Sequence, residues 1–223
     1  MLEFSIFKPF SERIIHGITT KDMGSFNDNE SGFNEKYSEL RAISPNPIFS
    51  RQMHGDGIII IEKTPENIFE ADSFITNKSG FTLVIKIADC QAILIYDPVK
   101  SVIAAAHAGW RGTALNIAGK TIRKMSDEFG SDPSDLFVGI SPSLGPCCAQ
   151  FSDPLNELPD FMHKFVKDRY VDLWSAAVKQ LTDAGVPEDH IELYGECTKC
   201  NPDKYFSHRN GDTGRMAVFI SVK

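Results

Sequence analysis

The stretch GFTLVIKIADCQAILIYDPVKSVIAAAHAGWRG, Gly80–Gly112, decides the fold predicted for this chain. Three short apolar runs lie within it, at 81–87, 92–96 and 102–106. Continuous runs of β-branched and small apolar residues at this length are typical of strands that are covered on both faces. Cys90 and His107 come at the ends of two of these predicted strands, so a thiol and an imidazole are expected to be neighbours on a rigid sheet.

Patterns outside this stretch predict further elements of a mixed α and β domain. Strands are expected at 14–20, 57–62, 136–140, 191–194, 205–207 and 216–222, and helices at 35–41, 113–129 and 172–185. Thr113 and Asp172 are the expected N-caps of the two later helices, and Gly130 and Gly185 their stops. Neither a linker nor an internal repeat divides the chain, so residues 1–223 are expected to form one domain.

The composition argues against several classes of protein. The 223 residues carry a net charge of −7 and no long basic cluster, which argues against a nucleic-acid partner. No apolar stretch reaches membrane-spanning length, and the first residues lack the pattern of a signal peptide. Five cysteines, an odd number, favour free thiols in a cytoplasmic protein over a secreted disulfide scaffold.

His54, Cys90 and His107 are the strongest candidates for a functional site. Each lies in a short polar interruption beside an apolar run. Two imidazoles and one thiolate form a three-ligand set for zinc, with a fourth position open to water or substrate. Two other interpretations use the same residues: a buried free cysteine beside two hydrogen-bonded histidines, or a nucleophilic Cys90 with His107 as its base.

Charged residues in the same segments of the sequence are candidates to contact an anion or to orient the three candidate metal ligands. Arg111 opens the predicted helix after His107, where free backbone N–H groups favour an anion; an ordinary capped helix with a solvated arginine is the alternative. Asp72 and Asp89 are candidates to orient an imidazole or to act as a base. For Asp89, a plain turn or capping role is equally compatible with the sequence.

A second cysteine pattern lies near the C-terminus. Cys197 and Cys200 form a CxxC, with no second CxxC in the chain. A closed zinc knuckle would need Cys147 or Cys148 as well. Unligated thiols in a loop are the competing interpretation, and the spacing favours them.

Together these motifs identify a resemblance that covers nearly the whole chain. The chain resembles the laccase-domain (polyphenol oxidase) family, which is now regarded as zinc-dependent purine nucleoside phosphorylases. The segments that carry the resemblance are Gln52–Gly55 (QMHG), Ala88–Cys90 (ADC), Ala106–Gly112 (AHAGWRG), Gly145–Cys148 (GPCC) and Thr213–Ala217 (TGRMA).

The resemblance implies a fold, a cofactor and an activity. The fold is α/β (mixed α+β), a single three-layer domain with a central mixed sheet, as in the catalytic domain of cytotoxic necrotizing factor, a cysteine–histidine deamidase. The cofactor is zinc on the catalytic residues His54, Cys90 and His107. The reaction is phosphorolysis of adenosine, inosine, guanosine and methylthioadenosine, with adenosine deamination as a second activity. The expected partners are therefore a purine nucleoside and phosphate, and the chain is expected to be a monomer or a homodimer.

The chain departs from the family pattern at three positions. Lys21 stands where the family has an arginine, Gln91 where it has a proline, and Arg209 where it has paired arginines. Lys21 replaces a planar guanidinium with a point charge, which bears on phosphate or base binding. The expected substrate and phosphate contacts are thus Arg111, Asp72, Lys21 and Arg209.

Other functions compete with this one. A thiol deamidase or an amidase that edits peptidoglycan precursors would use Cys90 and His107 directly. A metal-binding module without turnover is the non-enzymatic alternative. Copper, which the laccase name suggests, is disfavoured because the chain has only six histidines and none of them forms a His-x-His pair.

Overall fold

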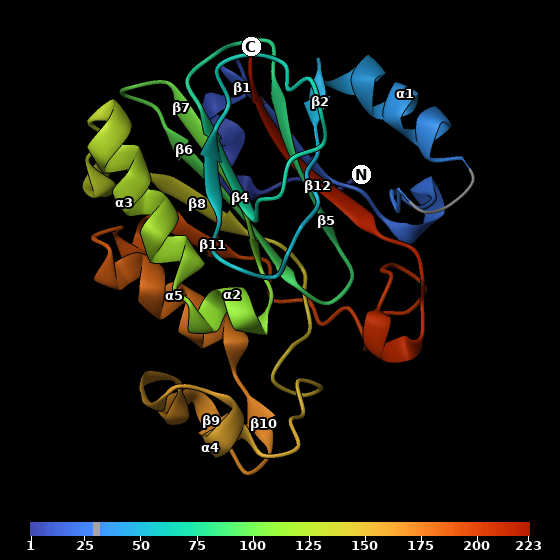
Figure 1. Ribbon diagram of the computed structural model, residues 1–223, viewed down its shortest axis with the longest axis vertical. Coiled ribbons are helices and arrows are strands. Elements are labelled where there is room, and N and C mark those ends of the chain that lie inside the picture. The colour runs from blue at the N-terminus through green and yellow to red at the C-terminus, as the bar shows by residue number, and fades with distance from the viewer. Residues whose placement is uncertain (29–31) are drawn as a thin grey trace.

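Two β-sheets stacked face to face form the body of the molecule (Figure 1). The computed structural model describes residues 1–28 and 32–223. One sheet has four strands in the order β1 (Ile14–Ile18), β12 (Met216–Val222), β5 (Thr82–Ile87) and β2 (Pro47–Ile48). The other has six strands in the order β11 (Ile191–Leu193), β8 (Phe137–Ile140), β6 (Gln91–Asp97), β7 (Val102–Ala108), β4 (Ser73–Thr76) and β3 (Ile58–Ile60).

Both sheets are mixed. In the four-stranded sheet β12 is antiparallel to β1 and β5, whereas β2 runs parallel to β5. In the six-stranded sheet β7 is antiparallel to β6 and β4, and β8 is antiparallel to β6. The outer pairs β3–β4 and β8–β11 are parallel. The predicted strands at 81–87, 92–96 and 102–106 are confirmed as β5, β6 and β7.

The expectation of one central sheet is wrong, because β5 belongs to a different sheet from β6 and β7. The chain passes from one sheet to the other at Ala88–Cys90, where Asp89 has a left-handed backbone with φ of 84°. An apolar run indicates that both faces of a strand are covered. A face can be covered by a second sheet or by a helix, and both give the same apolar pattern. The sequence pattern therefore does not distinguish one sheet between helices from two stacked sheets.

Alternate side chains of these strands pack into different layers. Leu83 and Ile85 of β5 lie between the sheets with Leu94 and Tyr96 of β6. On the other face of the six-stranded sheet, Ile93 and Ile95 pack in the same core as residues of α3 (Ile117–Phe129) and α5 (Leu173–Asp183). On the other face of the four-stranded sheet, Leu40 of α1 (Phe33–Ile43) packs in a core with Val84 and Phe219. Figure 1 shows α1 on one side of the sheets and α3 and α5 on the other.

The helix predicted at 113–129 is two helices. A short helix, α2 (Trp110–Ala114), is followed by α3, and Asn116 between them has a left-handed φ of 58°. Asn116, not Thr113, caps α3, since its side chain accepts a hydrogen bond from the N–H of Gly119. The predicted stop at Gly130 and the predicted cap at Asp172 are both confirmed.

The strand predicted at 205–207 is absent from the described residues. The N–H of Phe206 donates to Met216 Sδ, and that of Ser207 donates to Asp212 Oδ2, so this backbone bonds to side chains instead of a ladder. The remaining elements are α4 (Pro154–Glu157), β9 (Val166–Lys167), β10 (Tyr170–Val171) and short 3-10 helices at Ser5–Phe10, Lys21–Met23, Pro133–Asp135, Asp160–Phe165, Glu188–His190 and His208–Asn210.

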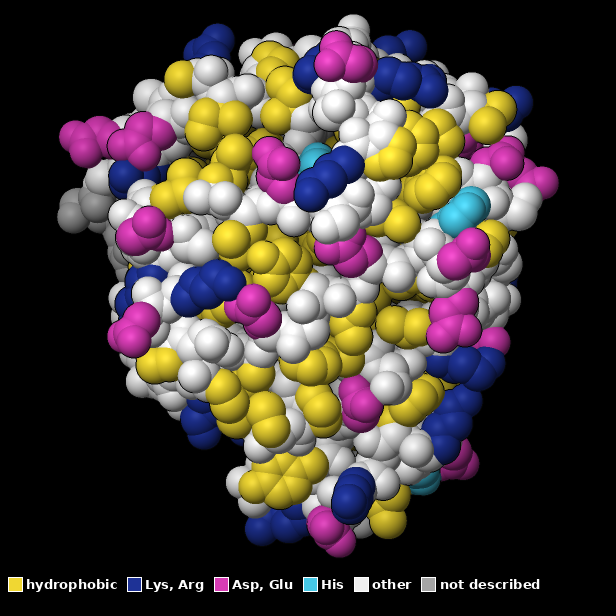
Figure 2. All heavy atoms as spheres, turned by 180° about the vertical axis from the view of Figure 1, so that it is seen from behind, with side chains coloured by type: hydrophobic (Ala, Val, Ile, Leu, Met, Phe, Trp, Pro, Cys, Tyr) yellow, Lys and Arg dark blue, Asp and Glu magenta, His cyan; other side chains and the backbone are white. Residues whose placement is uncertain are grey.

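Among the described residues, every helix is too short or too polar to cross a bilayer. On the face shown in Figure 2, acidic and basic side chains are scattered among hydrophobic ones. Such interspersed charge differs from the basic stripe of a nucleic-acid surface.

Candidate metal and anion site

Three side chains from separate segments meet at one end of the six-stranded sheet. Cys90 directly precedes β6, and His107 is the penultimate residue of β7, paired in register with Ala92. His54 comes from the loop between β2 and β3. One ligand atom of each of the three lies within 4.8 Å of the others. The two imidazole rings are nearly perpendicular, at 82°, with centroids 4.7 Å apart.

Asp72 holds both histidine segments in place. Its side chain is 1% exposed, and its Oδ1 accepts a hydrogen bond of 2.8 Å from His107 Nδ1. The same carboxylate accepts hydrogen bonds from the backbone N–H groups of Met53, His54 and Gly55 at 3.1, 2.9 and 2.8 Å. The bond to Nδ1 fixes the tautomer of His107 and leaves Nε2 available to a metal. This placement favours the orienting role of Asp72 over direct contact with substrate.

The charges of these groups support one another. Burial alone would raise the pKa of Cys90, but the neighbouring His107 and His54 outweigh it and lower that pKa to about 6. Burial would lower the pKa of His107, yet the Cys90 thiolate and Asp72 raise it to about 9. For Asp72, burial is again opposed, by hydrogen bonds from His107 and from backbone N–H groups, and the pKa falls below its ordinary value. Without a metal, these interactions favour the thiolate form of Cys90, the imidazolium form of His107 and the carboxylate form of Asp72.

The backbone at Gly109 approaches this site closely, and the small size of glycine suits that approach. A Cβ on Gly109 would lie 3.0 Å from Cys90 Sγ and 3.4 Å from His54 Cδ2. His54 itself has a left-handed backbone with φ of 58°. A larger residue at position 109 would require the thiol or the imidazole to shift by a few tenths of an ångström.

The donor set fits a metal ion. Two imidazole nitrogens and a thiolate supply three ligands, fewer than the four of closed structural zinc sites, so a fourth position stays open. His107 is buried, Cys90 is half-buried and His54 is exposed toward a cavity of about 750 Å³ that all three line. An ion held here would be reachable from that cavity.

Basic side chains are concentrated in the lining of the cavity. Its lining includes five basic side chains, Arg51, Lys86, Arg111, Arg209 and Arg215, against the two carboxylates Asp28 and Asp89. The Asp28 carboxylate pairs with Lys86 at 2.6 Å. In a chain with a net charge of −7, this concentration of positive charge at one cavity is suited to an anionic ligand.

Arg111 and Arg209, the predicted phosphate or substrate contacts, both line the cavity. The Arg111 guanidinium stacks 4.2 Å from the ring centroid of Trp110 and is exposed. Arg209 Nη2 donates to Gln150 O at 2.9 Å, and the backbone N–H of Arg209 donates to Asp89 Oδ2 at 2.7 Å. Both guanidinium groups retain N–H donors for a ligand.

Asp89 has a structural role. Besides the bond from Arg209, its Oδ1 accepts from Thr198 Oγ1 at 2.6 Å, and its backbone O accepts from the N–H of Leu144 at 2.8 Å. Of the two roles that the sequence left open, the structure favours the turn role. Asp89 joins three loops that form the cavity wall.

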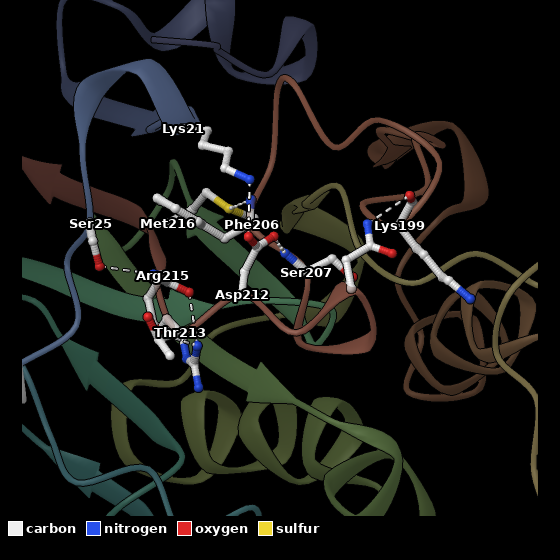
Figure 3. A network of polar contacts seen from close by, with 11 residues as sticks. Lys21, Ser25, Lys199, Phe206, Ser207, Asp212, Thr213, Arg215 and Met216 are labelled. Atoms are coloured by element: carbon white, nitrogen blue, oxygen red, sulfur yellow. Dashed lines mark hydrogen bonds and ion pairs between the residues drawn. The ribbon is translucent and has the colours of Figure 1, made fainter.

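Lys21 lies outside the lining of this cavity. Its Nζ pairs with Asp212 Oδ1 at 3.1 Å and lies 5.3 Å from the centroid of the Phe206 ring. Figure 3 shows Lys21 pointing toward Asp212, with Arg215 on the other side of that residue. The predicted contact between Lys21 and substrate has no support in this geometry.

Sequence reasoning missed two of the lining cations, Arg51 and Lys86, and identified Arg215 only as a cation near a late strand, without assigning it to the site. Lys86 was detectable, because it is the one charged residue in the apolar run 81–87. Arg215 lies within the TGRMA segment, and the spacing there did not distinguish a cation of the site from a solvated hairpin. The larger apolar side chains of the lining are Ile68, Leu144, Phe151, Leu173 and Trp110.

Comparisons with known proteins show which family this chain is related to. A family model described as "Multi-copper polyphenol oxidoreductase laccase" matches residues 20–223. Purine nucleoside phosphorylase YlmD of Bacillus subtilis is 35% identical over 163 residues, which are 68% of this chain and 59% of the relative. Purine nucleoside phosphorylase LACC1 of Homo sapiens is 33% identical over 208 residues, 87% of this chain and 46% of the relative. The chain thus spans about half the length of these curated relatives.

A solved structure has the same fold. The crystal structure of YlmD from Geobacillus stearothermophilus superposes with a TM-score of 0.84 at 27% identity. The superposition covers 99% of this chain and 94% of that one.

Proposed function

The chain belongs to the family described as multi-copper polyphenol oxidoreductase laccase, and from that premise we propose that it is a zinc-dependent purine nucleoside phosphorylase. The proposed substrates are adenosine, inosine, guanosine and methylthioadenosine with phosphate, and adenosine deamination is the proposed side activity. One observation carries the proposal: an open three-ligand metal set lies on a cavity lined by five cations. The names of the relatives support the reaction class.

The cations of the cavity suit the phosphate. Phosphorolysis needs an anion held beside the C1′ carbon of the sugar, with water kept out. Arg111 and Arg209 each present a planar guanidinium that can bind two phosphate oxygens at once. The helix after Gly109 is too short to add much of its own dipole, so the guanidinium groups are the main phosphate contacts in this proposal.

The apolar side of the cavity suits the purine. Trp110, Phe151 and Leu144 offer rings and an aliphatic surface to a flat base, and they exclude water from the reacting bond. In the reaction, a phosphate oxygen bonds to C1′ as the bond from C1′ to the purine nitrogen breaks. The purine leaves with the electron pair and takes up the proton that hydrogen phosphate loses. A zinc ion on His54, Cys90 and His107 would supply Lewis acidity to a phosphate oxygen, or to water in deamination.

The experiment is metal analysis of the purified protein beside an assay of base release from adenosine and inosine, with and without phosphate. The proposal expects zinc and a release that depends on phosphate. Lys21→Ala is the control for Arg111→Ala, because it also removes a single cation, but one that lies outside the lining of the cavity. Copper in the analysis with oxidation of a catechol, or no release from any nucleoside, would overturn the proposal.

A thiol hydrolase is the second candidate, and the contact between Cys90, His107 and Asp72 favours it. This order of nucleophile, base and orienting carboxylate is also that of cysteine hydrolases. The predicted likeness to the deamidase domain of cytotoxic necrotizing factor belongs to this candidate, as does an amidase that edits peptidoglycan precursors. Amide hydrolysis that persists in metal-free protein and is lost in Cys90→Ser would favour it over the phosphorylase. Cytoplasmic location and a monomeric or homodimeric state stay predictions.

A further inference from the structure

Four of the five cysteines gather at a second place in the molecule. The Sγ atoms of Cys147, Cys148, Cys197 and Cys200 all lie within 4.8 Å of one another. We propose that these four thiols form a closed tetrathiolate zinc site, separate from the one on the cavity. This is the knuckle that the CxxC spacing alone disfavoured, and it needs both cysteines of the adjacent pair.

The distances between the sulfur atoms suit a zinc ion better than disulfides. Cys147 Sγ and Cys148 Sγ lie 3.7 and 3.5 Å from Cys200 Sγ. Four sulfurs placed tetrahedrally about 2.3 Å from zinc are about 3.8 Å from each other. A disulfide requires about 2.05 Å and binds its sulfurs only in pairs. The thiols are thus spaced as ligands of one ion.

The backbone around the cluster is arranged to bring two distant loops together. The loop after β8 and the loop after β11 are joined by hydrogen bonds from Ser143 N to Glu196 O and from Thr198 N to Ser143 O. The N–H of Gly145 donates to Cys197 Sγ at 3.3 Å. A Cβ on Gly145 would lie 3.1 Å from the Cβ of Cys197 and 2.9 Å from Trp174 Cη2, so the small size of glycine suits this close approach.

The cluster has the features of a structural site. It supplies four ligands of one kind, which complete the tetrahedral coordination of zinc and leave no position for substrate. None of the four cysteines is among the residues that line the cavity at His54. Soft thiolate ligands in this geometry select zinc over magnesium or calcium.

The position of the cluster suggests what the ion would do. Thr198, between the two cysteines of the CxxC, donates to Asp89, which also accepts from the N–H groups of Leu144 and Arg209. Leu144 and Arg209 line the cavity. Zinc on the four thiols would therefore fix the wall that carries these two residues.

The test counts metal ions and identifies their ligands in the whole chain. Cys90→Ser, which disables the cavity site but leaves the four thiols intact, should retain one zinc. Its cobalt-substituted form should show the intense thiolate-to-cobalt absorption of a tetrathiolate site. Cys197→Ser with Cys200→Ser is the reciprocal variant, and should retain metal only at the cavity site.

Several outcomes would overturn the site. They are a Cys90→Ser protein without zinc, a cobalt spectrum without thiolate bands, and an intact mass that shows disulfides in place of metal. The Cys90→Ser measurements do not require the double variant to fold. They are also independent of nucleoside cleavage, so failure of the phosphorylase proposal and failure of this one are distinguishable.

Discussion

The cavity site and the four-cysteine cluster are both groups of side chains that could hold a metal ion, but they are built in different ways. The cavity site has three ligands of two kinds, two of them beside strand ends of the six-stranded sheet, and one face open to the cavity. The cluster has four identical ligands on two loops. Open sites with three protein ligands suit chemistry, and closed sites with four suit structure. The contrast predicts that damage to the first affects activity and damage to the second affects stability.

The two sites also differ in what holds their ligands. At the cavity site a buried carboxylate, Asp72, accepts hydrogen bonds from one ligand ring and from the backbone of another. At the cluster, backbone hydrogen bonds join the loops, and Gly145 donates directly to a sulfur. Loss of zinc should therefore leave the cavity site largely formed, whereas the cluster depends on the ion to hold its exposed cysteines.

The largest expected effect comes from His107→Ala. Loss of one of three ligands removes the metal from the cavity site, and nucleoside phosphorolysis should fall by about 10³-fold, equivalent to several kcal/mol of transition-state stabilisation. Zinc content should fall by one ion per chain. His208→Ala is the matched control, since His208 is an exposed histidine that also lines the cavity. The His208→Ala protein should retain the metal at the cavity site. Full activity in His107→Ala would contradict a metal role for the set.

Cys197→Ser with Cys200→Ser should mainly lower stability. Metal binding to a structural site contributes directly to folding, so a loss of several kcal/mol and a fall of about 10 °C or more in Tm are expected. Thermal denaturation followed by circular dichroism measures the change. Cys90→Ser should shift Tm by much less. If the two variants lost equal stability, the division into open and closed sites would not hold.

Asp72→Asn tests the orienting carboxylate. The amide can accept from His107 but carries no charge, so zinc affinity at the cavity site should fall by about 10- to 100-fold. Competition with a coloured chelator measures that affinity. Zinc at the four-cysteine cluster should be unchanged in the same titration, which provides an internal control. An unchanged affinity at the cavity would mean that Asp72 acts only on the backbone of the loop at 53–55.

The smallest expected effect is that of Arg111→Ala. Removal of one exposed guanidinium should raise KM for phosphate by about tenfold. A hydrogen bond to a charged group contributes about 1.4 kcal/mol, and that free energy corresponds to a factor of ten in affinity. KM for the nucleoside should change little, and zinc content at both sites should stay the same. Lys21→Ala should leave KM for phosphate unaltered. Equal effects of the two variants would indicate general electrostatic attraction instead of a defined contact.

Local sequence patterns determined much of the fold. The apolar runs fixed β5, β6 and β7, because a strand covered on both faces needs a continuous apolar sequence. Asp172 was predicted as the cap of α5 because an aspartate side chain satisfies free N–H groups of the first turn. The set of His54, Cys90 and His107 was also predicted, since those residue types next to predicted strand ends suit a metal, and the structure brings them together.

Tertiary structure decided the features that depend on which segments meet. The division of strands between two sheets, the meeting of Cys147 and Cys148 with Cys197 and Cys200, and the entry of Lys86 and Arg215 into the cavity lining all join residues that are distant in sequence. An apolar pattern in the sequence indicates that a side chain is buried, but it does not indicate which segment packs against that side chain. Spacing places ligands on elements, but only the packing of those elements brings sulfur atoms to within the reach of one ion.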